Sequence, residues 1–432
     1  YEYDDARRLV AVSNHLGERI EYTVDAAGNR TAETIKSSTG VIVHSLSRVY
    51  DELSRVISIT GGNGQTSEYR YDVDDNNTQS IDGRSNTSSQ SFDALNRLVQ
   101  SSDANGGVTQ YTQDANNRLT KVIDPRGIET VYTYDAFDNQ TSLSSPDSGV
   151  ATMSYDEAGN LISRTDANGV VSNYQYDALN RLLSINYPSF PEENITYEYD
   201  AIADGNHGVG RLTKITNASG YLSFSYNHLG QITEKRYTVD SVLYQMAYDY
   251  DLAGNLQSVT YPSGRVVHYS RDDQGRVIGV TTKASVSSPS QTVISSVSYL
   301  PFGPISGYTY GNGLVQSMNY DQGYRLSQLS VSGVSNPIGR SYSYDGNSNI
   351  TGIDDVADPA ESQSLSYDVL NRVTRSTVDT TQIDYAYDKV GNRTNKTLTK
   401  PNALLTESYH YATTSNRLTA IDIDSNGVTS RR

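Results

Sequence analysis

The stretch Tyr176-Asp177-Ala178-Leu179-Asn180-Arg181-Leu182 decides the fold, because close copies of it recur along the whole chain. An Asp ends a tyrosine-rich segment every 21 residues in the most regular part, as at Asp72, Asp93 and Asp114. Nineteen units align in this way, and sixteen of them carry Asp at this position. Arg follows the Asp at the end of the motif in ten units, and Asn takes its place in seven. A fixed period of this length is the signature of a repeat architecture.

Each unit is predicted to contain two strands and two turns. Tyr174 and Tyr176 are two residues apart, so their rings lie on the same face of a strand. Asp177 then opens a tight turn, in which its carboxylate can accept backbone N–H groups two residues on. Asn180, or Gly in other units, can adopt the left-handed conformation that closes such a turn. The strand that returns is rich in β-branched residues and leads to a second turn, such as Asp103-Ala-Asn-Gly106.

Because each unit is a hairpin that connects directly to the next, the sequence predicts an all-β fold. The fold is expected to be one long antiparallel sheet of about nineteen repeat hairpins. We interpret the chain as one continuous array, regular over 1–200, irregular with insertions over 201–319, and regular again over 320–432. A sheet of so many strands accumulates twist and must curl. We therefore expect a spiralling sheet that forms part or all of a hollow shell, with tyrosines of neighbouring units paired in ladders.

The residues expected to build the repeat are the tyrosine before the Asp, the Asp itself, and the Gly or Arg that follows it. They are Tyr3, Asp4, Tyr50, Asp51, Tyr71, Asp72, Asp93, Arg97, Tyr134, Asp135, Tyr155, Asp156, Gly159, Tyr176, Asp177, Arg181, Tyr250, Asp251, Gly254, Tyr367, Asp368, Arg372, Tyr387, Asp388 and Gly391.

The composition excludes several classes of function. The net charge of −16 repels nucleic acid and anionic membrane surfaces. The absence of cysteine removes disulfides, thiol nucleophiles and cysteine metal sites. Tyrosine dominates the aromatic residues, with 35 Tyr against 5 Phe and no Trp, which favours wet sheet faces over a thick dry core. No leader or membrane-spanning segment is expected in this stretch, which begins without Met and is interpreted as part of a longer polypeptide.

The motif Tyr-Asp-x-x-Gly/Asn-Arg-Leu, as in Tyr176 to Leu182, resembles the YD repeat of Rhs proteins. The same repeat is found in the C subunits of insecticidal toxin complexes, in bacterial wall-associated proteins and in animal teneurins. The segment Tyr299-Leu-Pro-Phe-Gly-Pro-Ile-Ser-Gly307 also resembles a stretch of bacterial Rhs chains. The resemblance implies a secreted or cell-surface β-shell that, in toxin-bearing members, encloses a toxic C-terminal domain. We expect no cofactor, and as partners we expect an encapsulated cargo domain of the same polypeptide, with delivery-system subunits or glycans as further candidates, the glycans because exposed tyrosine rings can stack on sugars.

The Rhs shells that release a toxin carry paired Asp-Pro-x-Gly motifs whose aspartates are thought to cut the chain. Here Asp124-Pro-Arg-Gly127 is a lone match, and it occupies the position of an ordinary second turn. Asp358-Pro359 is followed by Ala-Glu and does not complete a pair. We therefore expect neither a protease nor a toxin domain in this chain.

Other chemical motifs are weak. The segment Asp72 to Thr78 mimics the start of an EF-hand loop but lacks its central Gly and terminal Glu, so it is interpreted as a repeat turn. Gly205 to Gly210 lies in an insertion without the strand–loop–helix context of a phosphate loop. No zinc site is expected from the six scattered histidines, which are His15, His44, His207, His228, His268 and His410.

Two hypotheses for the function stay open. The first is a structural shell segment that encapsulates a toxic or folded cargo. The second is a cell-surface adhesin or binding module that holds carbohydrate or protein on exposed Tyr and Asn side chains. An enzyme is disfavoured, because no catalytic constellation is visible in the sequence.

Overall fold

The computed structural model describes residues 1–333 and 338–432. It confirms the predicted fold class: the protein is all-β, with one antiparallel sheet of 39 strands that is not closed. Consecutive strands pair through short turns, as β7 does with β8 and β8 with β9. The three helical turns in the described chain are η1 (Pro191–Glu193), η2 (Ala203–Gly205) and η3 (Pro359–Glu361).

The strands of the first part of the chain are β1 (Glu2–Tyr3), β2 (Leu9–Ser13), β3 (Arg19–Val24), β4 (Arg30–Lys36), β5 (Ile42–Tyr50), β6 (Val56–Gly61), β7 (Thr66–Tyr71), β8 (Asn77–Ile81), β9 (Thr87–Phe92), β10 (Leu98–Ser102), β11 (Val108–Gln113) and β12 (Leu119–Ile123). The middle part contains β13 (Glu129–Tyr134), β14 (Gln140–Ser145), β15 (Gly149–Tyr155), β16 (Leu161–Thr165), β17 (Val171–Tyr176), β18 (Leu182–Asn186), β19 (Ile195–Tyr199), β20 (Leu212–Asn217), β21 (Gly220–Tyr226), β22 (Ile232–Val239), β23 (Val242–Tyr250), β24 (Leu256–Thr260), β25 (Val266–Arg271), β26 (Val277–Lys283) and β27 (Gln291–Tyr299). The last part contains β28 (Ile305–Tyr310), β29 (Val315–Tyr320), β30 (Leu326–Ser332), β31 (Ile338–Tyr344), β32 (Ile350–Asp355), β33 (Gln363–Tyr367), β34 (Val373–Val378), β35 (Thr381–Tyr387), β36 (Arg393–Lys400), β37 (Ala403–Tyr411), β38 (Leu418–Ser425) and β39 (Val428–Arg431).

The turn that follows each tyrosine strand, here called the first turn, has one repeated geometry. At Asp93 the backbone N–H donates to the carbonyl of Arg97 at 3.0 Å, and the N–H of Asn96 donates back to the carbonyl of Asp93 at 3.0 Å. Asn96 has a φ of 59°, the left-handed conformation that Asn and Gly tolerate best. The Asp93 Oδ1 atom accepts the N–H groups of Leu95 and Arg97 at 2.9 and 3.1 Å, so the Asp closes the turn as an acceptor.

The last repeat differs from its predicted register. Its turn opens at Ala412, whose N–H donates to the carbonyl of Arg417 at 3.0 Å, and not at Thr413. One extra residue lies between the tyrosine strand and the Arg, because β37 already ends at Tyr411.

The predicted tyrosine ladders are wrong in their pairing. Each repeat contributes two strands, so the strand beside a tyrosine strand is a returning strand and not its equivalent. Tyr176 of β17 lies opposite Leu182 of β18, and Tyr250 of β23 lies opposite Leu256 of β24. A tyrosine therefore packs beside an aliphatic side chain, and the equivalent tyrosine lies two strands away.

Burial is thin throughout the described chain, as the tyrosine-rich composition predicts. The buried apolar side chains are small or β-branched, among them Ala11, Val259 and Ala420, and no large side chain is fully buried. Most strand residues are half-buried. No helix among the described residues is long and apolar enough to cross a membrane.

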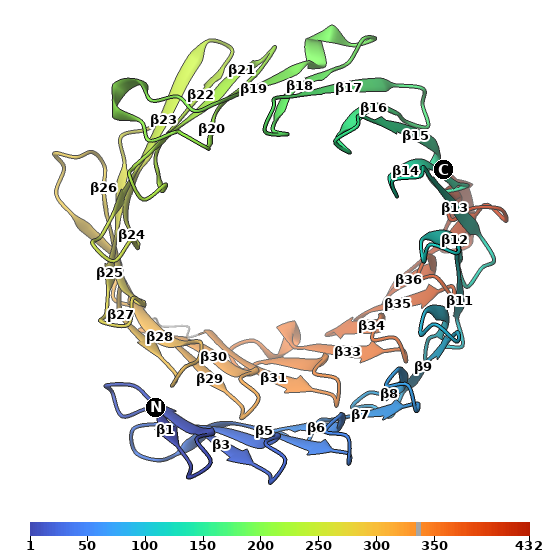
Figure 1. The fold of residues 1–432 in the computed structure, drawn as a ribbon. Helices are drawn as coiled ribbons and strands as arrows, with labels where there is room; N and C mark the ends of the chain where they lie inside the picture. Colours follow the sequence, from blue (N-terminus) through green and yellow to red (C-terminus); the bar gives the residue numbers. More distant parts are fainter. Residues whose placement is uncertain (334–337) are drawn as a thin grey trace. The chain divides into compact units, whose positions relative to one another are not determined.

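The chain divides into two compact units. The first contains residues 1–129, 297–309 and 313–432, and the second contains residues 130–296 and 310–312. Within the first unit, the blue strands of the first part of the chain run beside the orange and red strands of the last part (Figure 1).

Candidate functional site

Repeats are joined to one another by a contact, here called the clamp, that is built from the recurring Asp, Arg and Tyr of the motif. In the first unit, Arg55 Nε donates to Asp51 Oδ2 at 2.7 Å within its own turn, while Arg55 Nη1 donates to the carbonyl of Asp72 in the next repeat at 2.9 Å. The same guanidinium lies 4.8 Å from the centre of the Tyr71 ring. Tyr71 donates its hydroxyl back to the carbonyl of Val56 at 2.9 Å. Charge-assisted hydrogen bonds and a cation–π contact thus fix one repeat on the next.

The predicted motif residues recur in this arrangement. Arg97, Arg181 and Arg372 contact Asp93, Asp177 and Asp368 in their own turns at 2.6–2.7 Å. Where Asn follows the Asp, its amide replaces the guanidinium. This is so at Asp72, Asp135, Asp156, Asp251 and Asp388, which accept from Asn76, Asn139, Asn160, Asn255 and Asn392 at 2.9–3.0 Å.

The tyrosines and glycines of the motif have equally regular positions. The hydroxyls of Tyr50, Tyr155, Tyr176, Tyr250, Tyr367 and Tyr387 donate to backbone carbonyls at 2.8–3.1 Å. Gly159, Gly254 and Gly391 have φ values of 81°, 85° and 92° at the turn position that Asn96 occupies elsewhere. At the first repeat, Asp4 contacts Arg8 at 2.7 Å, while Tyr3 on β1 stays exposed. Tyr134 ends β13, directly before Asp135.

The hydrogen bonds hold the turn carboxylates in their charged form. The side chain of Arg97 donates to Asp93 and lowers the pKa of that carboxyl to about 2. The hydrogen bond from the amide of Asn76 also lowers the pKa of Asp72 below its usual range. Within the EF-hand-like segment 72–78, the Asp72 carboxylate accepts hydrogen bonds from its own turn, and the Asp75 carboxylate accepts from Arg55 at 2.7 Å. This matches the interpretation of the segment as a repeat turn.

A second arrangement joins repeats that are far apart in sequence, all within the first unit. We use the name seam for the contact of three second turns, at 61–64, 82–85 and 124–127, with the first turns that open at Asp321, Asp345, Asp368, Asp388 and Ala412. Two arginines, Arg84 and Arg126, supply most of its side-chain hydrogen bonds, and two glycines make its closest approach.

Arg84 is the third residue of its second turn and enters between two first turns. Its Nη1 and Nη2 atoms donate to the carbonyls of Asp368 and Tyr367 at 2.7 and 3.1 Å. Its Nε atom lies 3.4 Å from Asp345 Oδ2. The neighbouring Asn347 donates its amide to Asp82, so both sides of the seam supply donors and acceptors.

Arg126 repeats this contact two repeats further on. It donates to the carbonyls of Ser415 and Ala412 at 3.0 and 2.8 Å, and to Asn416 Oδ1 at 2.8 Å. Asn416 in turn donates to Asp124 Oδ2 at 2.8 Å. Asp124 closes its own turn in the ordinary way, because its carbonyl accepts the N–H of Gly127 at 2.8 Å. The Asp-Pro-x-Gly match is therefore a second turn, as expected, and its Arg is a seam contact.

The third contact of the seam, at the second turn 61–64, has no arginine, and the neighbouring strand β5 takes part in it. The N–H of Ser45 donates to the carbonyl of Gln322 at 3.1 Å. The His44 ring lies 4.9 Å from the Tyr324 ring, and the His44 Nδ1 atom is buried without a hydrogen-bond partner in the structure. Burial raises the pKa of Tyr324 to about 12. Ring packing thus takes the place of the guanidinium here.

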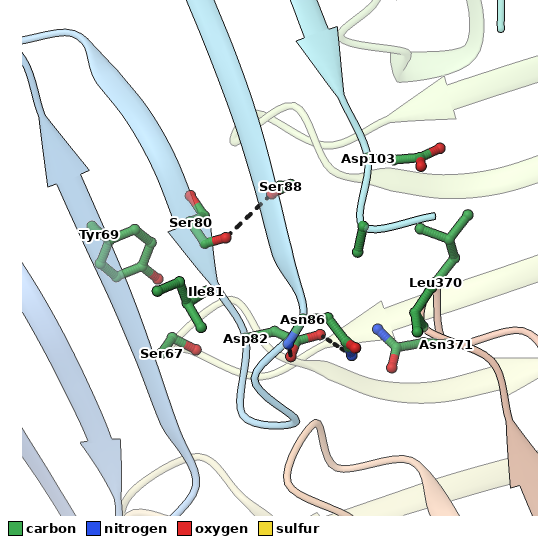
Figure 2. A pocket seen from close by; sticks show the side chains of 12 residues that line it. Ser67, Tyr69, Ser80, Ile81, Asp82, Asn86, Ser88, Asp103, Leu370 and Asn371 are labelled. Carbon is green, nitrogen blue, oxygen red and sulfur yellow. Dashed lines mark hydrogen bonds between the residues drawn. The ribbon is translucent and has the colours of Figure 1, made fainter. Parts of the chain in front are cut away.

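A pocket of about 370 Å³ lies where the intervening second turn, at 103–106, lacks an Arg. Figure 2 shows Asp103 and Leu370 on one side of it and Tyr69 with Ser67 and Ser80 on the other. The lining combines hydroxyl, amide and carboxylate groups with the apolar side chains of Ile81, Ala104, Val369 and Leu370. The polar groups of the lining can hold a ligand through hydrogen bonds.

The described residues contain no group of three or more His, Asp or Glu side chains placed to hold a metal ion. His207 and His228 approach each other with ring centres 6.4 Å apart, and His410 contacts Asp422 at 2.7 Å, as separate pairs. The insertion at 201–210 is held by Asn206, which bonds the backbone of Tyr226 and Phe224 at 2.8 and 3.1 Å.

The sequence interpretation missed Arg84, Arg126 and the glycines that allow their turns to approach. A signal was present. Among the second turns in the described chain, only 82–85 and 124–127 carry Arg at the third position, where the others carry residues such as Asn105, Asn168 or Ser263.

The family model described as RHS Repeat matches residues 114–150, 155–189 and 250–286. Comparison with curated proteins found no match. Among solved structures, the chain resembles "Crystal Structure of TcdB2-TccC3" with a TM-score of 0.81 and 16% identity, covering 95% of this chain and 25% of that one. The same complex without its hypervariable C-terminal region gives a TM-score of 0.80 at 15% identity, covering 96% and 26%.

The Tc holotoxin pore of Photorhabdus luminescens, carrying the TccC3 mutation D651A, is also similar, with a TM-score of 0.69 and 15% identity over 93% of this chain and 27% of that chain. This chain therefore spans about a quarter of the length of the structures it resembles. At this level of identity the likeness concerns the fold.

Proposed function

This chain belongs to the YD/Rhs-repeat family, and on that premise we propose that it is a structural segment of a β-shell that encloses a toxic or folded cargo. The observation that carries the proposal is the double tethering of the ribbon. Clamps such as that of Arg55 fix one repeat on the next, and the seam fixes turns that lie more than 280 residues apart, such as Arg84 and Asp368. A wall needs both, because a ribbon with local contacts alone would stay open along its edges.

The shape of the repeats supports a wall over a packed domain. No large side chain is fully buried among the described residues, so the sheet does not build a thick core. The likeness to the TcdB2-TccC3 structures over 95% of the chain agrees with this role. We propose that the role is non-enzymatic, that the cargo belongs to the same longer polypeptide, that delivery-system subunits or glycans are further partners, and that the protein is secreted or acts at the cell surface.

Small-angle X-ray scattering of the chain tests the wall. A distance distribution skewed towards large separations, as hollow bodies give, is the expected result. A rod-like profile would refute a shell. The double variant R84A/R126A is the matched comparison, because it leaves the clamps intact while it removes the seam contacts.

Enclosure of a cargo needs a separate experiment on the polypeptide as its gene encodes it. Limited proteolysis should leave segments outside the repeat array protected in the native protein and cleaved in R84A/R126A. Cleavage at equal rates in both proteins would refute enclosure, even if the scattering supports a shell.

Carbohydrate binding is a second candidate, favoured by the pocket beside Asp103. An aromatic ring, Tyr69, stands there among serine hydroxyls and the amides of Asn86 and Asn371, which are groups that bind sugars. Calorimetric titration with a panel of neutral oligosaccharides tests it, with Tyr69→Ala as the variant that should lose binding. No heat of binding for any member of the panel would remove this candidate.

A further inference from the structure

The first turns of the first unit follow a rule about which Arg reaches which carbonyl. An Arg that ends a first turn generally donates its guanidinium to the Asp carbonyl of the next first turn along the chain. Arg55 donates in this way to Asp72 and Arg97 to Asp114, both at 2.9 Å. Arg372 does the same to Asp388, also at 2.9 Å. These carbonyls are satisfied by the preceding repeat. Arg325 is an exception, because its Nη1 atom donates to the Ser348 hydroxyl at 3.1 Å.

Asn is too short to make this contact. Asn349 and Asn392 donate instead to Asn371 and Asn416, at 2.8 and 3.2 Å. The carbonyls that a longer side chain would have reached are those of the next turns. In the seam they are occupied by the distant arginines, because Arg84 donates to the carbonyl of Asp368. Arg126 likewise donates to the carbonyls of the turn that follows Asn392. An Asn in one turn thus creates the acceptor that a seam Arg fills.

The first turns at Asp51, Asp72 and Asp93 form a second edge of the first unit, here called the rim. Asn29 precedes the turn of Asp51, and Asn76 precedes the turn of Asp93. Within the described chain, the carbonyl of Asp51 accepts only the N–H of its own turn, from Ser54 at 3.0 Å, and that of Asp93 only from Asn96 at 3.0 Å. Each carbonyl oxygen has a second lone pair to offer. The rim therefore presents two carbonyl acceptors equivalent to those that Arg84 and Arg126 occupy in the seam. In the rim, no arginine occupies them among the described residues.

The spacing of these acceptors matches the seam. Asp51 and Asp93 lie two repeats apart, with the turn of Asp72 between them already served by Arg55. Arg84 and Arg126 are also two repeats apart, with Asn105 in the turn between them. A row of second turns with Arg in alternate repeats would therefore place one Arg at the carbonyl of Asp51 and the next at the carbonyl of Asp93. The same spacing is used in the seam.

The exposure of the apolar residues at the tips of the first turns also indicates that the rim lacks a partner that the seam has. In the seam, Val369, Leu370 and Val390 are half-buried. At the rim, the corresponding Leu53 and Leu95 are 66% and 67% exposed.

We propose that the rim docks the edge of a further antiparallel repeat ribbon, whose second turns carry Arg at the third position in alternate repeats. A second copy of this chain fits poorly, because its two arginines of this kind are already engaged in its own seam. The partner is thus another stretch of YD-type ribbon with free arginines. This inference concerns the rim alone and does not depend on whether a cargo is enclosed.

The test uses a cyclised, fluorescent hairpin peptide with the sequence of residues 77–92, which contains the Arg84 turn. Its binding to the whole chain is measured by anisotropy. The variant N29R/N76R should lose binding by about tenfold or more, because each new Arg fills the rim carbonyl from its own chain. The peptide with R84A should not bind. Asn160→Arg, in the second unit, is the matched control and should leave binding unchanged.

Three other results would overturn the proposal. Equal binding by N29R/N76R would place the peptide elsewhere, and stronger binding by the chain variant R84A/R126A would place it in the vacated seam. No binding to the unmodified chain up to about millimolar peptide, the weak limit of specific recognition, would also refute it. Loss of fold does not confuse the outcome, since thermal melting of N29R/N76R should show a midpoint at or above that of the unmodified chain.

Discussion

Gly83 and Gly346 face each other across the seam so closely that a Cβ atom built on either one would lie 1.9 Å from the carbonyl oxygen of the other. Neither glycine has the positive φ that would itself demand glycine. Close approach of two backbones is therefore the reason for both residues. The contact brings the turn of Arg84 near enough for its guanidinium to reach the carbonyl of Asp368.

The variant Gly83→Ala should destabilise the protein by about 1–3 kcal/mol, the usual cost of forcing atoms into a filled site. Chemical denaturation measures the loss, and hydrogen exchange should be faster at 82–86 and 345–349. Gly40→Ala is the control, because Gly40 has a φ of 83° and open space around it. It should cost about 1 kcal/mol from backbone strain alone and leave seam exchange unchanged. Equal effects of the two variants would contradict a steric seam.

The variants Arg84→Ala and Arg126→Ala should each lower the free energy of unfolding by about 1.5–3 kcal/mol, because each leaves carbonyl acceptors without a charged donor. Lysine at either position should restore only part of this, since it cannot make the forked contact. Arg375→Ala is the control. Arg375 pairs with Asp384 at the surface and is 54% exposed, so its removal should cost about 0–1 kcal/mol. A loss at Arg84 no larger than this would argue against the seam.

Much of the fold follows from the sequence because its determinants are local. The Asp that accepts its own turn's N–H groups, the left-handed residue three positions later and the alternating tyrosines all act within one repeat. Asp93 and Asn96 show this directly. The all-β antiparallel sheet could thus be predicted from a single unit and its period.

The seam could not be predicted in the same way, because its partners are set by how many repeats separate them. Nothing in the sequence near Asp124 indicates that Arg126 will contact Ser415, which lies 289 residues further along the chain. The tyrosine pairing failed for a related reason. The repeat period does not show that a returning strand lies between two equivalent tyrosine strands. Tyr176 is therefore paired with Leu182 of the returning strand and not with a tyrosine.

The tyrosine hydroxyls of the clamp should contribute measurably to stability. Tyr71→Phe removes the hydrogen bond to the carbonyl of Val56, 2.9 Å long, and should cost about 0.5–1.5 kcal/mol in denaturant unfolding. Tyr132→Phe is the matched control, because the structure gives the hydroxyl of this half-buried tyrosine no hydrogen-bond partner. A change near zero is expected there. If both variants behaved alike, the rings alone would account for the tyrosine content.

The stability of the repeats should fall in acid, in a window set by the turn carboxylates. The hydrogen bond from Arg97 lowers the pKa of Asp93 to about 2, so the carboxylate is favoured in the folded chain. At Asp368, burial opposes the charge, but hydrogen bonds from Arg372 outweigh it and the pKa is again lowered. A depressed folded pKa gives stability that is present above the unfolded pKa of about 3.9 and is lost as the pH falls through the folded value.

The variant Asp93→Asn isolates one such group. The difference in melting temperature between the unmodified chain and this variant should be constant above about pH 5 and shrink steadily between about pH 4 and pH 2. The same comparison in an Arg97→Ala background should show a smaller difference, because the largest cause of the pKa shift is gone. A difference that stays constant down to pH 2 would mean that the Asp93 carboxylate contributes through its shape and not through its charge.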